Sequence, residues 1–262
     1  MTTTTQHAIG MFCWSELATT DQEGAKKFYP ALFDWTIEDT PIGGGETYTL
    51  LKKNGREVGA LYTMQKAQRD QGVLPNWMPY VNVESADKVA TQIKQSGGKI
   101  LSEPFDVMEH GRMAVCQDPT KAIFSVWQPK KHTGAGLLNE VGSVCWNELI
   151  TDDAAKAGAF YRQVFGWTEE PMPMPQGTYT IFKKDGAQAA GLMQATPEMH
   201  LTHPYWLIYF AVEDCDKSVA KAQQLGGKTM MPPTDIPKIG RFSVLTDPKG
   251  AYFAIIAMAK QP

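Results

Sequence analysis

The stretch FCWSELATTDQEGAKKFY (Phe12 to Tyr29) occurs twice in the chain. Its second copy is VCWNELITDDAAKAGAFY (Val144 to Tyr161), at an offset of 132 residues. The match continues downstream, where PNWMPYVNVESADK (Pro75 to Lys88) recurs as PYWLIYFAVEDCDK (Pro204 to Lys217). A period near 130 residues is too long for a solenoid and indicates tandem homologous domains. We therefore predict domains over residues 8–128 and 141–262, joined by a linker over residues 129–140.

Local patterns inside each repeat predict a strand, a helix and three further strands, and then the same series again. FCWSELA alternates like a half-buried strand, and Asp21 is suited to cap the helix that follows. The pairs Asn54-Gly55 and Asp185-Gly186 lie between alternating runs, which predicts two-residue hairpin turns. Each domain is therefore expected to be βαβββ twice over, giving an α+β chain of four modules.

Composition excludes several classes of protein. Of 262 residues, 43% are hydrophobic and 20% charged, which is enough apolar material for a buried core. The net charge of −3 offers no basic surface for nucleic acid. No apolar run is long enough to span a bilayer, and the first residues do not resemble a secretion signal. We expect a cytoplasmic protein with neither nucleic acid nor membrane as partner. Its four cysteines and five histidines form no close metal-binding motif.

Several motifs resemble those of the vicinal oxygen chelate superfamily, which includes glyoxalase I, bleomycin-resistance proteins and extradiol dioxygenases. They are the helix motif FYPALFDW (Phe28 to Trp35), repeated as FYRQVFGW (Phe160 to Trp167), and the final hairpins GRMAVCQDPTKAIFSVW and GRFSVLTDPKGAYFAII. The resemblance covers nearly the whole chain and is greatest to two-domain, glyoxalase-like bacterial proteins often labelled hydroxylases. It implies two eight-stranded cups, each built from two modules.

The resemblance also implies a divalent metal held by side chains in each cup, and the sequence departs from that pattern. Tryptophan stands at the first-strand ligand position in both domains, and tryptophan cannot ligate. The other expected ligand positions of the two domains hold only apolar or hydroxyl side chains. The residues at these positions are Trp14, Met78 and Ser125 in the first domain and Trp146, Leu207 and Ala254 in the second. We therefore expect no metal site and no cofactor.

Glu16 and Glu148 are the candidate catalytic residues. Each lies two residues after a tryptophan, so a strand places the pair on one face, and the resemblance implies that this face lines the cup. A carboxylate in such a cup needs a partner, because an unpaired buried charge is unfavourable. The candidate partners are Arg112, Arg241, Tyr80 and Tyr209. The glutamates either brace the cup or act as general base or hydrogen-bond acceptor.

The remaining lining residues differ between the domains. Replacement of Asn82, Ser125 and Trp127 by Ala211, Ala254 and Ile256 removes polar or bulky groups from the second cup, so the first domain is expected to hold the main site. The full set of predicted ligand-binding residues is Trp14, Met78, Tyr80, Asn82, Arg112, Ser125, Trp127, Trp146, Tyr209 and Arg241.

The favoured function is binding of a small, partly aromatic or polyketide-like molecule, as bleomycin-resistance relatives bind drugs. The alternative is a lyase, hydroxylase or dioxygenase, either metal-dependent or metal-free with a glutamate base. Because four modules can close both cups within one chain, we expect a monomer or a weak homodimer.

Overall fold

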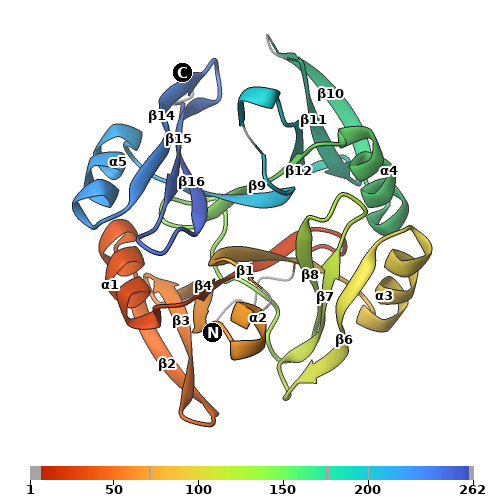
Figure 1. Cartoon of the computed structure of the whole chain (residues 1–262), viewed down its shortest axis with the longest axis horizontal. Helices are drawn as coiled ribbons and strands as arrows, with labels where there is room; N and C mark the ends of the chain where they lie inside the picture. Colours follow the sequence, from red (N-terminus) through yellow and green to blue (C-terminus); the bar gives the residue numbers. More distant parts are fainter. Residues whose placement is uncertain (1–6, 71, 175–176, 200, 260–262) are drawn as a thin grey trace. The chain divides into compact units, whose positions relative to one another are not determined.

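The computed structural model describes residues 7–70, 72–174, 177–199 and 201–259 (Figure 1). The elements of the first repeat are β1 (Phe12–Thr19), α1 (Gln22–Phe33), β2 (Thr36–Gly43), β3 (Glu46–Lys53), β4 (Arg56–Thr63), α2 (Lys66–Asp70), β5 (Asn76–Asn82), α3 (Ala86–Gln95), β6 (Lys99–Val107), β7 (Gly111–Gln117) and β8 (Ile123–Pro129). Those of the second are β9 (Val144–Thr151), α4 (Ala154–Phe165), β10 (Thr168–Met174), β11 (Gly177–Lys184), β12 (Ala187–Gln194), η1 (Pro197–Met199), β13 (Tyr205–Ala211), α5 (Cys215–Gln224), β14 (Lys228–Ile236), β15 (Gly240–Thr246) and β16 (Tyr252–Met258). Apart from the short α2 and η1, this is the predicted order of elements.

Each repeat forms one eight-stranded mixed sheet. The strand orders are β2-β3-β4-β1-β5-β8-β7-β6 and β10-β11-β12-β9-β13-β16-β15-β14. The first strand of every module pairs in parallel with the last, as β1 does with β4 and β5 with β8, whereas the hairpins are antiparallel. This topology confirms the predicted α+β fold, in which four βαβββ modules form two curled eight-stranded sheets.

Polar residues begin the module helices at the predicted points. The Asp21 carboxylate accepts the Gly24 N–H at 2.9 Å, and α1 therefore starts immediately after it. Asp153 caps α4 in the same way. In the hairpins, Asn54 and Gly55 have φ values of 51° and 75°, the left-handed conformation that a two-residue turn requires.

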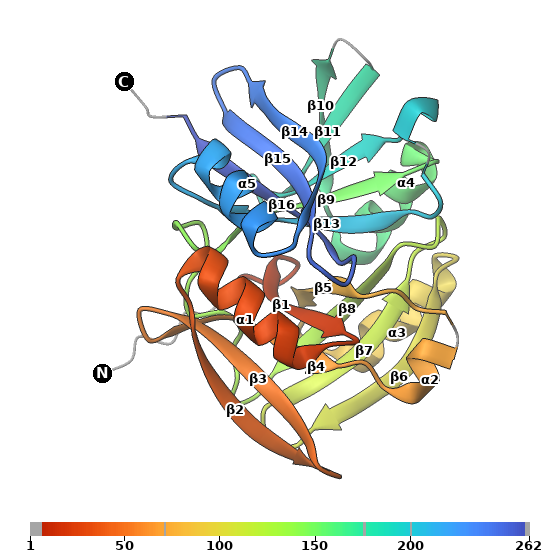
Figure 2. The same cartoon turned by 60° about the vertical axis from the view of Figure 1, so that its left-hand side comes forward.

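The hydrophobic cores do not follow the tandem repeats. Unit 1 comprises the residues up to Trp14, Met78–Gly134 and Asn147–Leu207, whereas unit 2 comprises Ser15–Trp77, Ala135–Trp146 and the residues from Ile208 onward. Within unit 2, α1 lies beside α5, and within unit 1, α3 lies beside α4 (Figures 1 and 2). Each compact unit therefore combines part of the first repeat with part of the second.

A buried Trp–Tyr–Asp chain of hydrogen bonds lies in the core of unit 2. The Trp77 indole donates to the Tyr29 hydroxyl at 3.0 Å, and that hydroxyl donates to the Asp247 carboxylate at 3.1 Å. The other carboxylate oxygen of Asp247 accepts two backbone N–H groups of the DPKG turn. Burial raises the pKa of the Asp247 carboxyl.

Unit 1 contains the same arrangement. Trp206 donates to the Tyr161 hydroxyl at 3.0 Å, which in turn donates to Asp118 at 3.0 Å. Burial also raises the pKa of the Asp118 carboxyl. In both units the tyrosine of one repeat thus bonds the DPxx turn of the other repeat.

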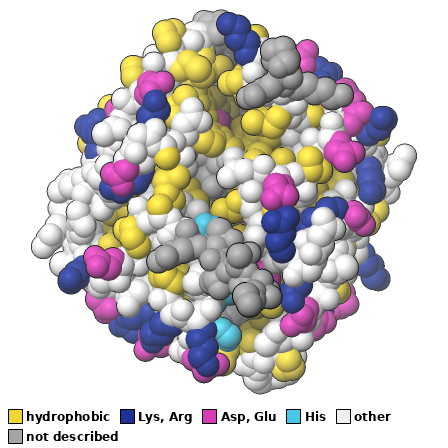
Figure 3. Space-filling view, turned by 180° about the vertical axis from the view of Figure 1, so that it is seen from behind, with side chains coloured by type: hydrophobic (Ala, Val, Ile, Leu, Met, Phe, Trp, Pro, Cys, Tyr) yellow, Lys and Arg dark blue, Asp and Glu magenta, His cyan; other side chains and the backbone are white. Residues whose placement is uncertain are grey.

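The surface is mixed in charge. On the face displayed in Figure 3, Lys and Arg side chains are interspersed with Asp and Glu and form no continuous basic field. Among the described residues, none of the helices has the length and apolar character needed to cross a membrane.

Candidate functional site

Four predicted site residues share one face of β5 and β8 in unit 1. Tyr80 pairs in register with Ser125, and Asn82 pairs with Trp127. Because side chains alternate along a strand, these four side chains point to the same side of the sheet. The Tyr80 hydroxyl lies 3.9 Å from the Met113 sulfur on β7, and Met113 is itself opposite Trp127. We call the face formed by Tyr80, Asn82, Met113, Ser125 and Trp127 the first inner face.

Two buried oxygen atoms on the first inner face lack a hydrogen-bond partner among the described residues. They are the Ser125 hydroxyl and the Asn82 side-chain carbonyl; Ser125 is 0% exposed and Asn82 3%. The Asn82 amide nitrogen is held in place by the His7 carbonyl at 2.6 Å. A buried polar atom without a partner costs about 1–3 kcal/mol, so a ligand that supplied the missing hydrogen bond would recover this energy.

Aromatic rings cover this face. Trp14 on β1 and Trp127 on β8 are buried, and both make edge contacts with the imidazole of His132, at centroid distances of 4.6 and 5.8 Å. His132 lies in the segment predicted to be a linker, and the sequence analysis did not include it among the site residues. Its only signal in the sequence is a histidine placed three residues after the last strand of the repeat. Met78, at the start of β5, is half-buried.

Glu16 lies in unit 2, within a cluster of phenols. The Tyr48 hydroxyl on β3 donates to its carboxylate at 2.9 Å. Tyr48 stands opposite Tyr62 on β4, and burial together with the charge of Glu16 raises the pKa of the Tyr62 hydroxyl. Gln68 on α2 donates to the same hydroxyl at 3.4 Å. Tyr62 therefore stays protonated at neutral pH, and a carboxylate beside a protonated phenol can accept one proton and donate another.

The second repeat is less polar at the matching positions. On β13 and β16, Tyr209 pairs with Ala254 and Ala211 with Ile256, so the hydroxyl of Ser125 and the amide of Asn82 have no counterpart. Tyr209 instead packs against Phe242, with ring centroids 6.1 Å apart.

The second glutamate site also differs from the first. Glu148 on β9 is buried, whereas Trp146 on the same strand is half-buried. On β12, Met193 stands opposite Tyr179, in the place that Tyr62 takes in the first repeat.

The two predicted arginines face away from the inner surface. Arg112 makes a bidentate ion pair with Asp87 of α3, at 2.7 and 2.8 Å, and Arg241 makes the same pair with Asp216 of α5. The expected pairing of these arginines with the first-strand glutamates is therefore wrong. The reason is strand parity: Arg112 is adjacent to Met113, so its side chain points to the opposite, helix-covered side of the sheet.

The residues present do not fit the metal that the fold implies. The Trp14 and Trp146 indoles have no lone pair available for a cation, and the hydroxyl of Ser125 is a weak ligand without neighbouring donors. In the part of the chain that the structure describes, no three His, Cys, Asp or Glu side chains come together in a group that could hold a metal ion.

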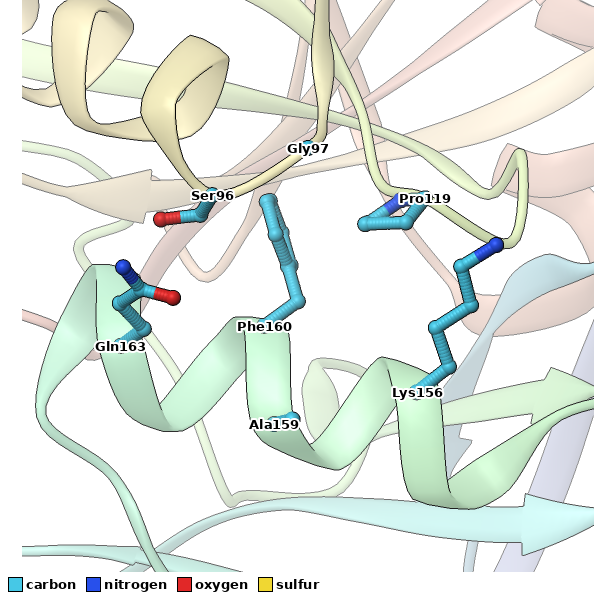
Figure 4. Close-up of a pocket in the computed structure, with 7 residues that line it drawn as sticks. All are labelled: Ser96, Gly97, Pro119, Lys156, Ala159, Phe160 and Gln163. Atoms are coloured by element: carbon cyan, nitrogen blue, oxygen red, sulfur yellow. The ribbon is translucent and has the colours of Figure 1, made fainter.

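A separate hollow of about 290 Å³ lies in unit 1, near the end of α3 and beside α4 (Figure 4). It is lined by Ser96, Gly97, Pro119, Lys156, Ala159, Phe160 and Gln163. None of the predicted site residues lines it. The hydroxyl of Ser96 is buried without a partner among the described residues.

Comparison with known proteins agrees with the fold. Tandem curled sheets of βαβββ modules define a glyoxalase-like architecture, and the model of the Glyoxalase/Bleomycin resistance protein/Dioxygenase superfamily matches residues 7–125 and 140–255. The chain therefore belongs to this superfamily, as its motifs predict.

Individual relatives match over almost the full chain. A Mycobacterium tuberculosis protein named "Putative glyoxylase CFP32" is 41% identical over 250 residues, covering 95% of each chain. The anthracycline biosynthesis protein DauV of a Streptomyces species is 33% identical, covering 97% of this chain and 95% of its own. The Mn(II)-bound glyoxalase of Novosphingobium aromaticivorans aligns with a TM-score of 0.65 at 12% identity, covering 95% of this chain and 82% of that one, which is a similarity of fold.

Proposed function

We propose that the first repeat binds a small, partly aromatic molecule of the polyketide type at its first inner face. The observation that carries this proposal is the fully buried Ser125 hydroxyl, which has no partner among the described residues and lies on the same face as Tyr80 and Trp127. Flat rings suit the stacking surfaces of an aromatic ligand, and the hydroxyl supplies the single polar contact that orients it. The relative DauV is named for the biosynthesis of anthracyclines, which are aromatic polyketides.

Binding can be tested with 1,8-dihydroxyanthraquinone, followed by quenching of tryptophan fluorescence. Ser125→Ala is expected to raise Kd about fivefold, because one hydrogen bond is lost. The same variant is expected to be as stable as the wild type or more so, since a buried hydroxyl without a partner is removed.

Ser96→Ala is the matched control, because it also removes a buried hydroxyl that has no partner among the described residues but lies in the separate hollow. It is expected to leave Kd unchanged. Absence of binding to the wild type, or equal weakening by both substitutions, would contradict the proposal.

A metal-free enzyme is the second candidate function, and the Glu16 cluster favours it. Glu16 accepts a hydrogen bond from Tyr48, and its charge acts on the Tyr62 hydroxyl. In a proton transfer, Glu16 would take a proton from the substrate while the Tyr62 hydroxyl hydrogen-bonds the oxygen on which negative charge develops. The second repeat has Met193 in place of Tyr62 and lacks this donor.

A further inference from the structure

The segment after β8 is fastened to unit 1 by backbone hydrogen bonds. The N–H groups of Lys130 and His132 both donate to the His110 carbonyl at 3.0 Å, and the Trp127 indole donates to the His132 carbonyl at 2.9 Å. These contacts fix the position of His132 without using its side chain.

A glycine then brings the same segment against β1. Gly134 has φ +113°, and a Cβ at this position would lie 2.5 Å from the Cys13 carbonyl oxygen. Only glycine permits this approach. The linker is therefore built into the first repeat at this point.

The His132 ring is the outermost member of the aromatic group on this face. Trp14 and Trp127 are only 6% and 7% exposed, whereas His132, in edge contact with both, is half-buried. A ligand that approaches the two indoles from solvent consequently meets the imidazole. Ser125 lies two residues before Trp127 on the same face.

We propose that His132 is a ligand-binding residue, supplied by the linker, that recognises a phenolic or enolic hydroxyl next to a ligand carbonyl. A neutral imidazole carries one acceptor nitrogen, which suits an acidic hydroxyl, and the Ser125 hydroxyl can donate to the neighbouring carbonyl. This inference rests on the proposed binding function and narrows its ligand to hydroxy-carbonyl aromatics. By the repeat offset of 129 residues, the second repeat has Gln261 at this position in the sequence, which has no ring.

The test compares two probes, 1,8-dihydroxyanthraquinone and its dimethyl ether, by tryptophan fluorescence quenching. The wild type is expected to bind the dihydroxy compound about tenfold more tightly, because only that compound offers a hydroxyl proton. His132→Phe keeps the aromatic packing but has no ring nitrogen, and it is expected to reduce the ratio of the two Kd values to about one. His132→Ala keeps the backbone contacts and is expected to lose the same discrimination.

His110→Phe is the control, since the carbonyl of His110 holds the segment while its side chain is exposed. It is expected to keep the wild-type ratio. A wild-type ratio in a folded His132 variant would overturn the role of His132 but leave the proposed function standing. Failure of the wild type to bind either probe would overturn both.

Discussion

The two repeats share one frame but line their inner faces differently. Each unit contains a Trp–Tyr–Asp chain with bonds of 3.0–3.1 Å, and each uses a tyrosine and an aspartate from different repeats. The linings, by contrast, differ in hydroxyl, amide and indole groups. A hydrogen-bonded core constrains both repeats equally, because each unit depends on its own chain, whereas a ligand needs only one suitable face.

The frame should respond to substitution equally in the two units. Trp77→Ala and Trp206→Ala each remove a buried indole, 4% and 5% exposed, and leave a tyrosine hydroxyl without its donor. Each is expected to lower the free energy of unfolding by about 4 kcal/mol. Urea denaturation followed by circular dichroism measures the change. Leu74→Ala, at a 66% exposed residue, is the control and should cost less than about 0.5 kcal/mol. A cost in one unit twice that in the other would break the equivalence.

The glutamates should separate the two repeats. Glu16→Gln is expected to weaken binding of 1,8-dihydroxyanthraquinone, or to slow any turnover, about tenfold, because it removes the charge next to Tyr48 and Tyr62. Glu148→Gln is expected to change the same quantity less than twofold, and circular dichroism should show both variants folded. Equal losses would favour the interpretation that these residues only brace the sheets.

The buried aspartates give the frame a pH dependence that the two units should share. The pKa values of Asp118 and Asp247 are raised by burial, so the folded state holds these protons more tightly than the unfolded state. Their contribution to stability is full below the unfolded pKa of about 4 and is lost as pH rises through the folded pKa.

Asp118→Asn and Asp247→Asn remove this titration. The difference in unfolding free energy, wild type minus variant, should therefore fall as pH rises from about 4. Urea titrations at several pH values measure it. A difference that grows with pH for either variant would show that the carboxylate is favoured in its charged form.

The smallest effect is expected from metal removal. Both repeats have tryptophan at the first-strand ligand position, so dialysed protein should contain well under one equivalent of Zn, Ni, Fe or Mn. Addition of a chelator should leave the melting temperature unchanged. Elemental analysis showing one metal per repeat would restore the metal-dependent lyase or dioxygenase as the better hypothesis.

The sequence by itself determined the local structure. The repeat, the Asp21 cap and the Asn54-Gly55 turn each depend on residues close together in the chain, and the structure has them where they were predicted. Superfamily membership followed from motifs of the same local kind. Strand alternation also predicted that Ser125 and Trp127 share a face, because that relation holds within one strand.

Tertiary structure decided the relations that local patterns leave open. Alternation tells which residues share a face but not which face is covered by a helix, and for this reason Arg112 was expected to meet Glu16 when its partner is Asp87. The linker has no periodicity, so nothing local indicated that His132 lies against Trp14. The pairing of Tyr29 with Asp247 joins residues from different repeats, and it depends on long-range packing of buried rings that only the folded chain brings together.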